Sequence, residues 1–260
     1  MTDIVTERSG SVLRVELNRP SKKNAMTSAM YITMADLLNA AAKDDRVRVV
    51  LWHGAGDSFC AGNDLDDFLK NPPGPEDSPQ SRLINAFIAF EKPIVAAVKG
   101  AAVGGGTTML THCDFVYAGE TAKFQMPFIN LALVPEFGAT FSVPLRAGYL
   151  RAAELLQLGL PFDATQALEF GMVTRVVPDH RLLETATDTA QKLAEKPAAA
   201  LEASKRLLKK PWRDALLEAV KAENSEFSLR VRSLDTKEAI TAFFEKRPPD
   251  FTQSRKTAVA

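Results

Sequence analysis

The sequence predicts an α/β fold, in which short apolar strands alternate with amphipathic helices. Two observations carry this prediction. From the N-terminus to about residue 175, β-rich apolar runs and helical patterns alternate, separated by turns that contain glycine or proline. The final stretch is helical by pattern, with prolines between its segments. We therefore expect a core over residues 1–195, with crossover connections between strands, and a helical C-terminal region over residues 196–260.

The N-terminal part supplies the first elements. Residues 12–17 alternate between apolar and polar side chains, which predicts a half-buried strand. Thr27 or Ser28 can cap a helix whose apolar side chains follow helical spacing. Residues 47–51 form a β-rich apolar run, and Asp64 stands where an N-cap would begin a short helix.

A polar, proline-rich segment over residues 71–81 interrupts the alternation. Its composition predicts an exposed and mobile loop. We expect this loop near the substrate pocket because it follows the glycine-bearing segment that ends at Leu65. The later elements follow by pattern: a helix over 83–90, strands over 94–98, 114–117 and 173–177, an irregular stretch over 127–138, and mainly helices from residue 145.

Composition limits the partners and the compartment. The chain has 32 basic and 32 acidic residues and a net charge of zero, so no global field attracts nucleic acid or an anionic membrane. No run of about 18 apolar residues exists, so no membrane span is expected. Cys60 and Cys113 give no disulfide framework. With no signal peptide pattern at the N-terminus and no Ser-Lys-Leu at the C-terminus, we expect a cytoplasmic protein.

Two glycine-bearing segments have the pattern of loops that present backbone N–H groups to an oxygen anion. Phe59 to Leu65 carries a glycine just before the expected helix start, and Val98 to Thr107 places three glycines between a strand and a helix. Glycine allows close approach of a ligand, and free N–H groups at a helix start favour negative charge. Either segment alone could be a structural turn, and the G-x-G-x-x-G spacing of dinucleotide sites is absent.

Other reactive side chains give weaker patterns. Cys60 has no basic neighbour in sequence, so we expect a small buried side chain rather than a nucleophile. His112, Cys113 and Asp114 are consecutive, and consecutive side chains on one element do not converge. The three histidines lack metal-ligand spacing, so no metal is expected. The basic stretch over residues 204–210 is more typical of a solvated helix face than of a phosphate contact.

Glu136 is the best candidate for a catalytic acid/base. It lies in the segment Val134 to Thr140. A loop carboxylate in water is too weak a base for proton abstraction, but burial raises the pKa of such a group. The nearby apolar side chains that could supply this environment are Phe128, Leu131, Leu133 and Phe137.

Taken together, these segments resemble the crotonase (enoyl-CoA hydratase/isomerase) superfamily over nearly the whole chain. The matching motifs, in the family's order and spacing, are Asn18-Arg19-Pro20 with Asn24-Ala25-Met26, Phe59 to Leu65, Gly104-Gly105-Gly106, Cys113-Asp114 and Ala242 to Arg247. The resemblance implies a spiral of β-β-α units, with helical C-terminal residues that pack between subunits. It also implies a homotrimer or a dimer of trimers.

The resemblance further implies a site for an acyl-CoA thioester. The thioester oxygen would lie between the backbone N–H groups of Asn63 and Gly105. The remaining substrate contacts would come from Lys23, Ala25, Ala61, Asp64, Leu65 and Phe128. Coenzyme A is part of the substrate in such enzymes, so no separate cofactor is expected.

Two departures from the family pattern favour one branch of it. Enoyl-CoA hydratases carry two glutamates at positions that read Thr108 and Phe128 here, and neither side chain is a general base at neutral pH. The motifs around Asn63 and Glu136 instead resemble the peroxisomal type of Δ3,Δ2-enoyl-CoA isomerase, in which one glutamate is the only acid/base. The alternatives are a hydratase and a non-catalytic acyl-CoA binder.

The C-terminal region contains one apolar pattern that bears on assembly. Leu216, Leu217, Val220 and Phe227 recur near helical spacing. If a lone appendage carried this face, it would expose a large apolar surface, so the pattern predicts contact between subunits.

Overall fold

The main sheet of the computed structural model, which describes residues 2–74 and 77–252, has the strand order β1-β2-β3-β4-β6-β9. β1 and β2 are antiparallel, and each later pair of neighbours is parallel. The strands span Ile4–Ser9 (β1), Val12–Leu17 (β2), Val49–Gly54 (β3), Ile94–Val98 (β4), Phe115–Gly119 (β6) and Arg175–Val177 (β9). The expected strand over 12–17 is confirmed, whereas β1 was missed because its residues are mostly exposed and polar.

A smaller sheet runs beside the main one and produces the spiral. It contains β5 (Ala101–Val103), β7 (Lys123–Gln125) and β8 (Phe162–Asp163) in that order. Consecutive strands β4 and β5, and then β6 and β7, place one strand in each sheet before the chain turns into a helix. Isolated bridges between Met26 and Asn63 and between Cys60 and Ala102 extend the same pattern toward the N-terminus. The predicted spiral of β-β-α units is confirmed.

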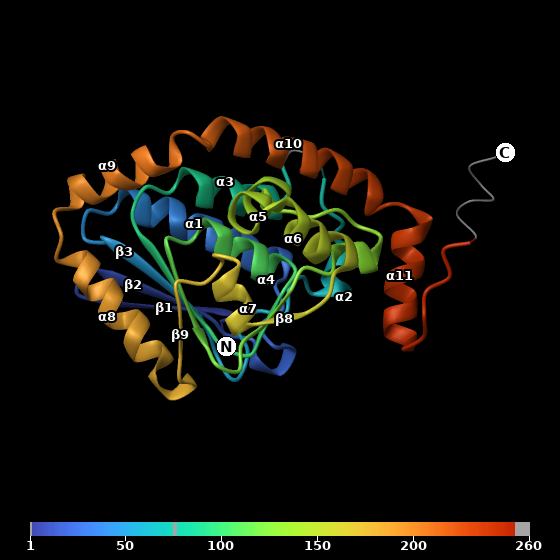
Figure 1. Ribbon diagram of the computed structural model, residues 1–260, viewed down its shortest axis with the longest axis horizontal. Coiled ribbons are helices and arrows are strands. Elements are labelled where there is room, and N and C mark those ends of the chain that lie inside the picture. Colours follow the sequence, from blue (N-terminus) through green and yellow to red (C-terminus); the bar gives the residue numbers. More distant parts are fainter. Residues whose placement is uncertain (1, 75–76, 253–260) are drawn as a thin grey trace.

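Helices cover both faces of the main sheet (Figure 1). Alternate residues of β3 face opposite ways, as the pleat requires. Val50 and Trp52 pack in the larger core, with α1 (Ser28–Lys43) and α3 (Pro79–Ala89). Val49 and Leu51 pack in a second cluster, with α8 (Leu182–Ala194). Both faces are therefore dry, which explains why β3 is a continuous apolar run.

The other helical segments include short turns that carry loops of the site. They are η1 (Pro20–Lys22), α2 (Leu65–Lys70), α4 (Gly105–Thr108), η2 (Met109–His112), η3 (Phe128–Leu131), α5 (Ala139–Ala147), α6 (Tyr149–Ala153), the π-helical turn η4 (Glu154–Leu158), α7 (Ala164–Glu169) and η5 (Asp179–Arg181). The predicted caps are observed. Thr27 caps α1 by accepting the N–H of Met30, and Asp64 caps α2 by accepting the N–H of Asp67.

Three C-terminal helices finish the chain: α9 (Ala198–Lys209), α10 (Arg213–Arg230) and α11 (Leu234–Glu245). α10 crosses the molecule over α3 and α5, and α11 then turns back along its side (Figure 1). α10 contacts α5, and α11 contacts η3. Residues 253–260 of the predicted C-terminal region lie outside the described residues.

The predicted loop over residues 71–81 is shorter than expected. Ser78 caps α3, and the Gln80 and Ser81 side chains are buried in that helix. The prediction is wrong at this end because it treats Pro79 as a sign of a loop, whereas proline is also favoured at the first position of a helix. Residues 75–76, also part of the expected loop, lie outside the described residues.

The predicted subunit contact through the apolar face of α10 is not supported by its packing. Val220 and Phe227 are buried in the chain's own core, Leu216 packs against that core, and Leu217 is 40% exposed. The sequence pattern was real, but the partner of this face is the same chain. Within the described residues, every helix is too short or too polar to cross a membrane.

Candidate active site

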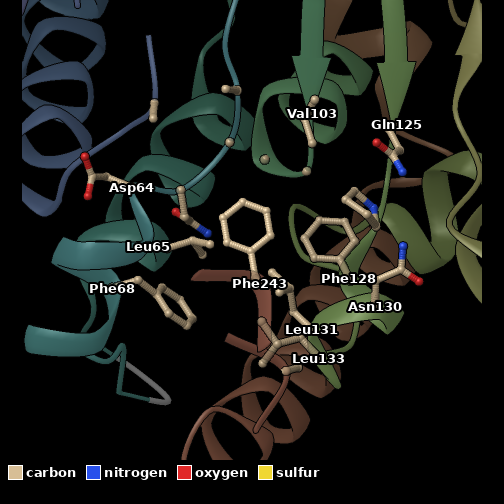
Figure 2. A pocket seen from close by; sticks show the side chains of 18 of the residues that line it. Asp64, Leu65, Phe68, Val103, Gln125, Phe128, Asn130, Leu131, Leu133 and Phe243 are labelled. Carbon is tan, nitrogen blue, oxygen red and sulfur yellow. The ribbon is translucent and has the colours of Figure 1, made fainter. Parts of the chain in front are cut away.

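A pocket of about 630 Å3 opens between the loops of the spiral, η3 and α11. Figure 2 shows the Phe243 ring of α11 between Leu65 of α2 and Phe128 of η3. Predicted site residues that line this pocket are Ala25, Ala61, Asn63, Asp64, Leu65, Gly105 and Phe128. Two predicted residues do not line it. Lys22, rather than the expected Lys23, lines the pocket. Glu136 is buried beneath Gly105, which does line it.

The turn before α1 is held by two buried or half-buried polar side chains. Asn24 adopts a positive φ and donates to the carbonyls of Ala55 and Ser58, at 2.9 and 2.7 Å. Arg19 donates to the Ala25 carbonyl and to Asp64, at 2.5 and 3.0 Å. These bonds explain the Asn18-Arg19-Pro20 and Asn24 motifs as structural, because they fix the turn against the segment that carries Asn63.

Asp64 has a structural role that its sequence position predicted. Its carboxylate accepts the N–H of Asp67 at 3.1 Å and forms an ion pair with Arg19. Partial burial opposes ionisation, but the N–H and the guanidinium outweigh it and lower the pKa of Asp64. Asp64 therefore stays charged and holds the start of α2 at the pocket.

Two backbone N–H groups face the pocket without a protein partner. In the described part of the chain, neither the N–H of Asn63 nor that of Gly105 donates to an acceptor, and both residues line the pocket. The neighbouring N–H groups are occupied: Asp64 donates to Met26, and Gly104 donates to Gln125. The fold thus leaves free the two donors that the resemblance predicted.

Each residue of the triple glycine is required for a different reason. Gly104 has φ 54° and ψ −124°, a conformation that side chains avoid. A Cβ at Gly105 would lie 2.8 Å from Oε1 of Glu136 and 3.0 Å from the Tyr31 hydroxyl. A Cβ at Gly106 would lie 2.5 Å from the carbonyl oxygen of Cys60. The three glycines therefore allow the backbone of residues 104–106 to lie against the carboxylate of Glu136, the candidate base.

Glu136 is brought to this place by a loop with unusual backbone geometry. Phe137 has φ 64° and Gly138 has φ 66°, so two successive residues are left-handed. The Phe137 side chain is fully buried, and its carbonyl accepts a bond from Nε2 of His112 at 2.8 Å. Burial lowers the pKa of His112 to about 3, which keeps the ring neutral and suited to this role.

The surroundings of Glu136 make it a stronger base than an exposed carboxylate. The side chain is 3% exposed, and burial, with the nearby charge of Glu223, raises its pKa to about 8. A hydrogen bond from the Asn63 amide offsets part of this rise. Oε1, the atom nearest Gly105, has no hydrogen-bond partner among the described residues.

A buried tyrosine orients the Asn63 side chain. The Tyr31 hydroxyl donates to Oδ1 of Asn63 at 2.7 Å, which directs the amide nitrogen elsewhere. Burial, followed by the charge of Glu136, raises the pKa of Tyr31 well above its usual value, so its proton stays in place. The chain Tyr31–Asn63–Glu136 therefore links α1 to the donor loop and the candidate base.

The comparisons with known proteins agree with this geometry. The family model for enoyl-CoA hydratase/isomerase matches residues 7–255. The chain belongs to this family.

Individual relatives of this enoyl-CoA hydratase/isomerase family member carry different activities in their names. The 1,2-epoxyphenylacetyl-CoA isomerase of Escherichia coli is 35% identical, with 97% of this chain and 99% of that protein covered. The 2,3-dehydroadipyl-CoA hydratase of the same organism is 34% identical, with 96% and 99% covered. Enoyl-CoA delta isomerase 2 of Rattus norvegicus is 33% identical, with 94% of this chain and 64% of that protein covered. The solved structure of Pseudomonas aeruginosa OdaA is 43% identical and superimposes with a TM-score of 0.91, with 94% of this chain and 99% of that chain covered.

The two positions where the resemblance would place the glutamates of a hydratase hold no acid. Thr108 is fully buried in α4, where its hydroxyl donates to the Gly104 carbonyl at 3.3 Å. Phe128 lines the pocket with an apolar ring. Glu136 is accordingly the buried carboxylate that lies against Gly105.

The remaining reactive side chains are explained by packing. Cys60 is fully buried, and burial raises its pKa to about 12, so the expectation of an inert thiol is confirmed. His112 and Asp114 do not converge, as expected: the histidine bonds Phe137, whereas Asp114 bonds the N–H of Ile94 and Lys205. The described residues contain no cluster of acidic, cysteine or histidine side chains able to hold a metal ion.

The solvated face predicted over residues 204–210 is wrong for two lysines. Lys205 is 5% exposed and forms an ion pair with Asp114 at 2.7 Å. Lys209 is largely buried, and burial together with Lys205 lowers its pKa to about 8. The sequence showed a basic run but not that two long stems pack inward with their nitrogen atoms buried.

Sequence reasoning missed four residues of the site. Tyr31 and Glu223 support the loops, and Phe243 and Arg247 come from or follow α11. One signal existed for Glu223: it is an acidic residue on the apolar face of α10, seven positions after Leu216. A carboxylate on the buried face of a helix indicates that a hydrogen-bonding partner is buried with it.

Proposed function

We propose that this protein is a Δ3,Δ2-enoyl-CoA isomerase, which moves the double bond of a 3-enoyl-CoA to the trans-2 position. One observation carries the proposal. The buried carboxylate of Glu136 lies beside Gly105, which lines the pocket together with Asn63, and the backbone N–H groups of both residues have no acceptor among the described residues. Double-bond migration needs one group that takes a proton and returns it, together with donors that stabilise an enolate.

The proposed reaction begins at C2 of the substrate, whose protons are acidified by the thioester and by the adjacent double bond. Glu136 takes one of these protons, and the charge moves to the thioester oxygen as a dienolate. The N–H groups of Asn63 and Gly105 hold that oxygen, each donor supplying roughly 100- to 1000-fold in rate. Glu136 then returns the proton at C4, and the double bond moves to C2–C3.

The raised pKa of Glu136 suits this cycle. A base with a pKa of about 8 abstracts a carbon-bound proton better than an ordinary carboxylate does, yet it is still partly ionised near neutral pH. The apolar wall formed by Phe128, Leu131 and Leu133 would keep the acyl chain in a dry region.

Hydration is the rival reaction, and a hydratase is among the similar proteins. Two carboxylates that position and activate water are expected for efficient hydration. Thr108 and Phe128 occupy those places, and neither side chain accepts a proton at neutral pH. The third alternative is an acyl-CoA binder without activity. Binding alone does not require a buried carboxylate such as Glu136 or two backbone N–H groups that lack an acceptor among the described residues.

A paired assay tests the proposal. The protein is incubated with 3-hexenoyl-CoA and, separately, with crotonyl-CoA, and products are separated chromatographically. We expect rapid formation of trans-2-hexenoyl-CoA and little hydration of crotonyl-CoA. Efficient hydration with slow isomerisation would make the hydratase correct, and saturable binding without either product would make the binder correct.

A gain-of-function variant provides a second test. Thr108→Glu with Phe128→Glu restores carboxylates at both hydratase positions. We expect only weak hydration of crotonyl-CoA, because Thr108 is fully buried and two like charges in a dry site raise each other's pKa. Thr108→Glu alone should give less.

A further inference from the structure

We propose that Glu223, on α10, is a positioning residue that holds the loop of Glu136 in place and keeps a negative charge beside that carboxylate. The inference rests on the proposed role of Glu136 as acid/base. α10 would then influence the proposed proton transfer through a side chain that does not line the substrate pocket.

The side chain of Glu223 accepts hydrogen bonds from Gly138, the N-cap of α5, and from Thr140 in the first turn of that helix, just after the loop that carries Glu136. Its Oε2 accepts the N–H of Gly138 at 2.7 Å. Its Oε1 accepts both the N–H and the hydroxyl of Thr140, at 2.7 and 2.6 Å. The two partners lie 85 and 83 positions away in sequence, so the bonds join α10 to the loop rather than one helix turn to the next.

The hydrogen bonds to Glu223 favour its charged form, whereas its burial favours the neutral form. Glu223 is 5% exposed, and its burial outweighs the three hydrogen bonds and raises its pKa to about 7. Donors that point at both oxygens stabilise the anion, and a protonated carboxyl would lose one of these bonds. The partners are N–H and O–H groups without charge, so the negative charge of the ionised form of Glu223 is not neutralised by an ion pair and can act on Glu136.

The loop has little freedom around these bonds. A Cβ at Gly138 would lie 2.4 Å from Cδ1 of Leu216 and 3.1 Å from Cγ2 of Val220. Leu216, Val220 and Glu223 are spaced i, i+4 and i+7, so one face of α10 supplies both the packing and the carboxylate. On the other side, His112 donates to the Phe137 carbonyl. The left-handed backbone at residues 137 and 138 is thus fixed from two directions.

Two consequences for Glu136 follow. The bonds fix the position of its carboxylate relative to Gly105, and a displacement of about 1 Å can reduce a rate by roughly 100-fold. The charge of Glu223 also raises the pKa of Glu136. The other titratable groups that face Glu136 are Tyr31 and Cys60, whose pKa values are raised so far that both remain neutral. Glu223 is therefore the charged neighbour that adds to the effect of burial on the basicity of Glu136.

Two substitutions separate position from charge. Glu223→Gln keeps the length but removes the charge and turns one oxygen into a donor facing an N–H. Glu223→Asp keeps the charge but is too short to reach both partners. We expect kcat on 3-hexenoyl-CoA to fall about 10- to 100-fold in both variants, with KM changed by less than about two-fold. Glu226→Gln, which removes an exposed carboxylate on the same helix, should leave both values unchanged.

A direct titration supplies the decisive readout. Carboxyl 13C NMR of protein labelled at glutamate follows Glu136, whose signal is identified by its loss in Glu136→Gln. We expect the pKa of Glu136 to fall in Glu223→Gln, because a like charge has gone, and to stay raised in Glu223→Asp. The acid limb of kcat/KM against pH should move down with it.

Several outcomes would overturn the inference. An unchanged Glu136 titration in folded Glu223→Gln would refute the role of the charge, and an unchanged kcat in Glu223→Asp would refute the role in positioning. If Glu223→Gln does not fold, Glu223→Asp still tests positioning. If the wild-type protein does not isomerise 3-hexenoyl-CoA, the proposed function fails, but the NMR titration still decides whether Glu223 sets the pKa of Glu136.

Discussion

Three influences of the folded chain set the pKa of Glu136, the proposed base. Burial raises its pKa, Glu223 raises it further, and the Asn63 amide lowers it again. A carboxylate in an exposed loop has none of these influences and stays a weak base. The proposed chemistry therefore depends on the glutamate together with its burial and with neighbours from α10 and from the Phe59–Leu65 segment.

Replacing Glu136 with glutamine should remove isomerisation while it leaves acyl-CoA binding within a few-fold. Glutamine keeps the volume but cannot carry a proton, and a positioned base supplies roughly 100- to 10,000-fold in rate. In the wild type, kcat/KM should rise with pH up to about 8, since the base must be unprotonated to act and its pKa is about 8. Steady-state assays between pH 6 and 9 measure both effects. Near-wild-type turnover in the variant would show that another group is the base.

Replacing Tyr31 with phenylalanine should lower kcat by about 3- to 10-fold, from the 0.5–1.5 kcal/mol of one net hydrogen bond. The loss of the 2.7 Å bond frees the Asn63 amide to turn away from Glu136, while the pocket wall stays intact. KM should change by less than about two-fold. Tyr149→Phe, at an exposed position, is the matched control. A rise in KM with unchanged kcat would contradict this account.

At the scale of elements, the pocket joins a rigid part of the fold to a peripheral one. The strand β5, the glycines after it and the Cys60–Ala102 bridge form a dry framework whose positions are fixed by backbone contacts. α11 closes the opposite side with Phe243 and Phe244, which are 61% and 48% exposed. Large apolar side chains with so much exposed surface indicate a wall that is completed by a ligand.

Replacing Phe243 with alanine should raise KM for 3-hexenoyl-CoA about 10-fold and leave kcat within about two-fold, since covering an aromatic ring contributes roughly 1.5–3 kcal/mol. The melting temperature should stay within about 1 °C, because the ring is mostly exposed in the free protein. Leu208→Ala, an exposed apolar residue on α9 away from the pocket, serves as control. A large loss of stability without any change in KM would refute a role for α11 in binding.

At the scale of the whole molecule, another surface replaces α10 as the candidate for assembly. The stretch from α5 to β8 exposes a series of large apolar side chains: Leu145, Tyr149, Leu150, Leu158 and Leu160. Leu150 is 85% exposed and Tyr149 is 72% exposed, which is unusual for neighbours on one short helix. Burial between copies of the chain would remove this surface from water.

We expect three or six chains in solution, joined partly through this stretch. Sedimentation velocity at micromolar concentration measures the state directly. Leu150→Asp should shift the protein to smaller species, because a charge at a dry interface costs several kcal/mol. Leu183→Asp, on α8, is a control of the same chemistry at a different surface. A stable wild-type monomer would contradict the prediction.

Sequence patterns were sufficient to predict the fold class, and most of the predicted site residues line the pocket. The alternation of strands and helices, the caps at Thr27 and Asp64, and the glycine loops all depend on interactions within a few residues, so local patterns reveal them. The motifs also identified Asn63, Gly105 and Glu136 as one group, and the fold brings these three together.

Only the tertiary structure decided which chain segment covers each face and which charges face one another. The apolar side of α10 could pack on a second subunit or on its own core, and the pattern is identical in both cases; the fold placed it on Gly138. Lys205 could have been solvated, and Glu223 could have faced water. The pKa of Glu136 depends on burial and on a carboxylate 87 positions away in the chain, and no local pattern carries such distances. Sequence fixes which groups are available, whereas their separation in space sets the energies on which the chemistry depends.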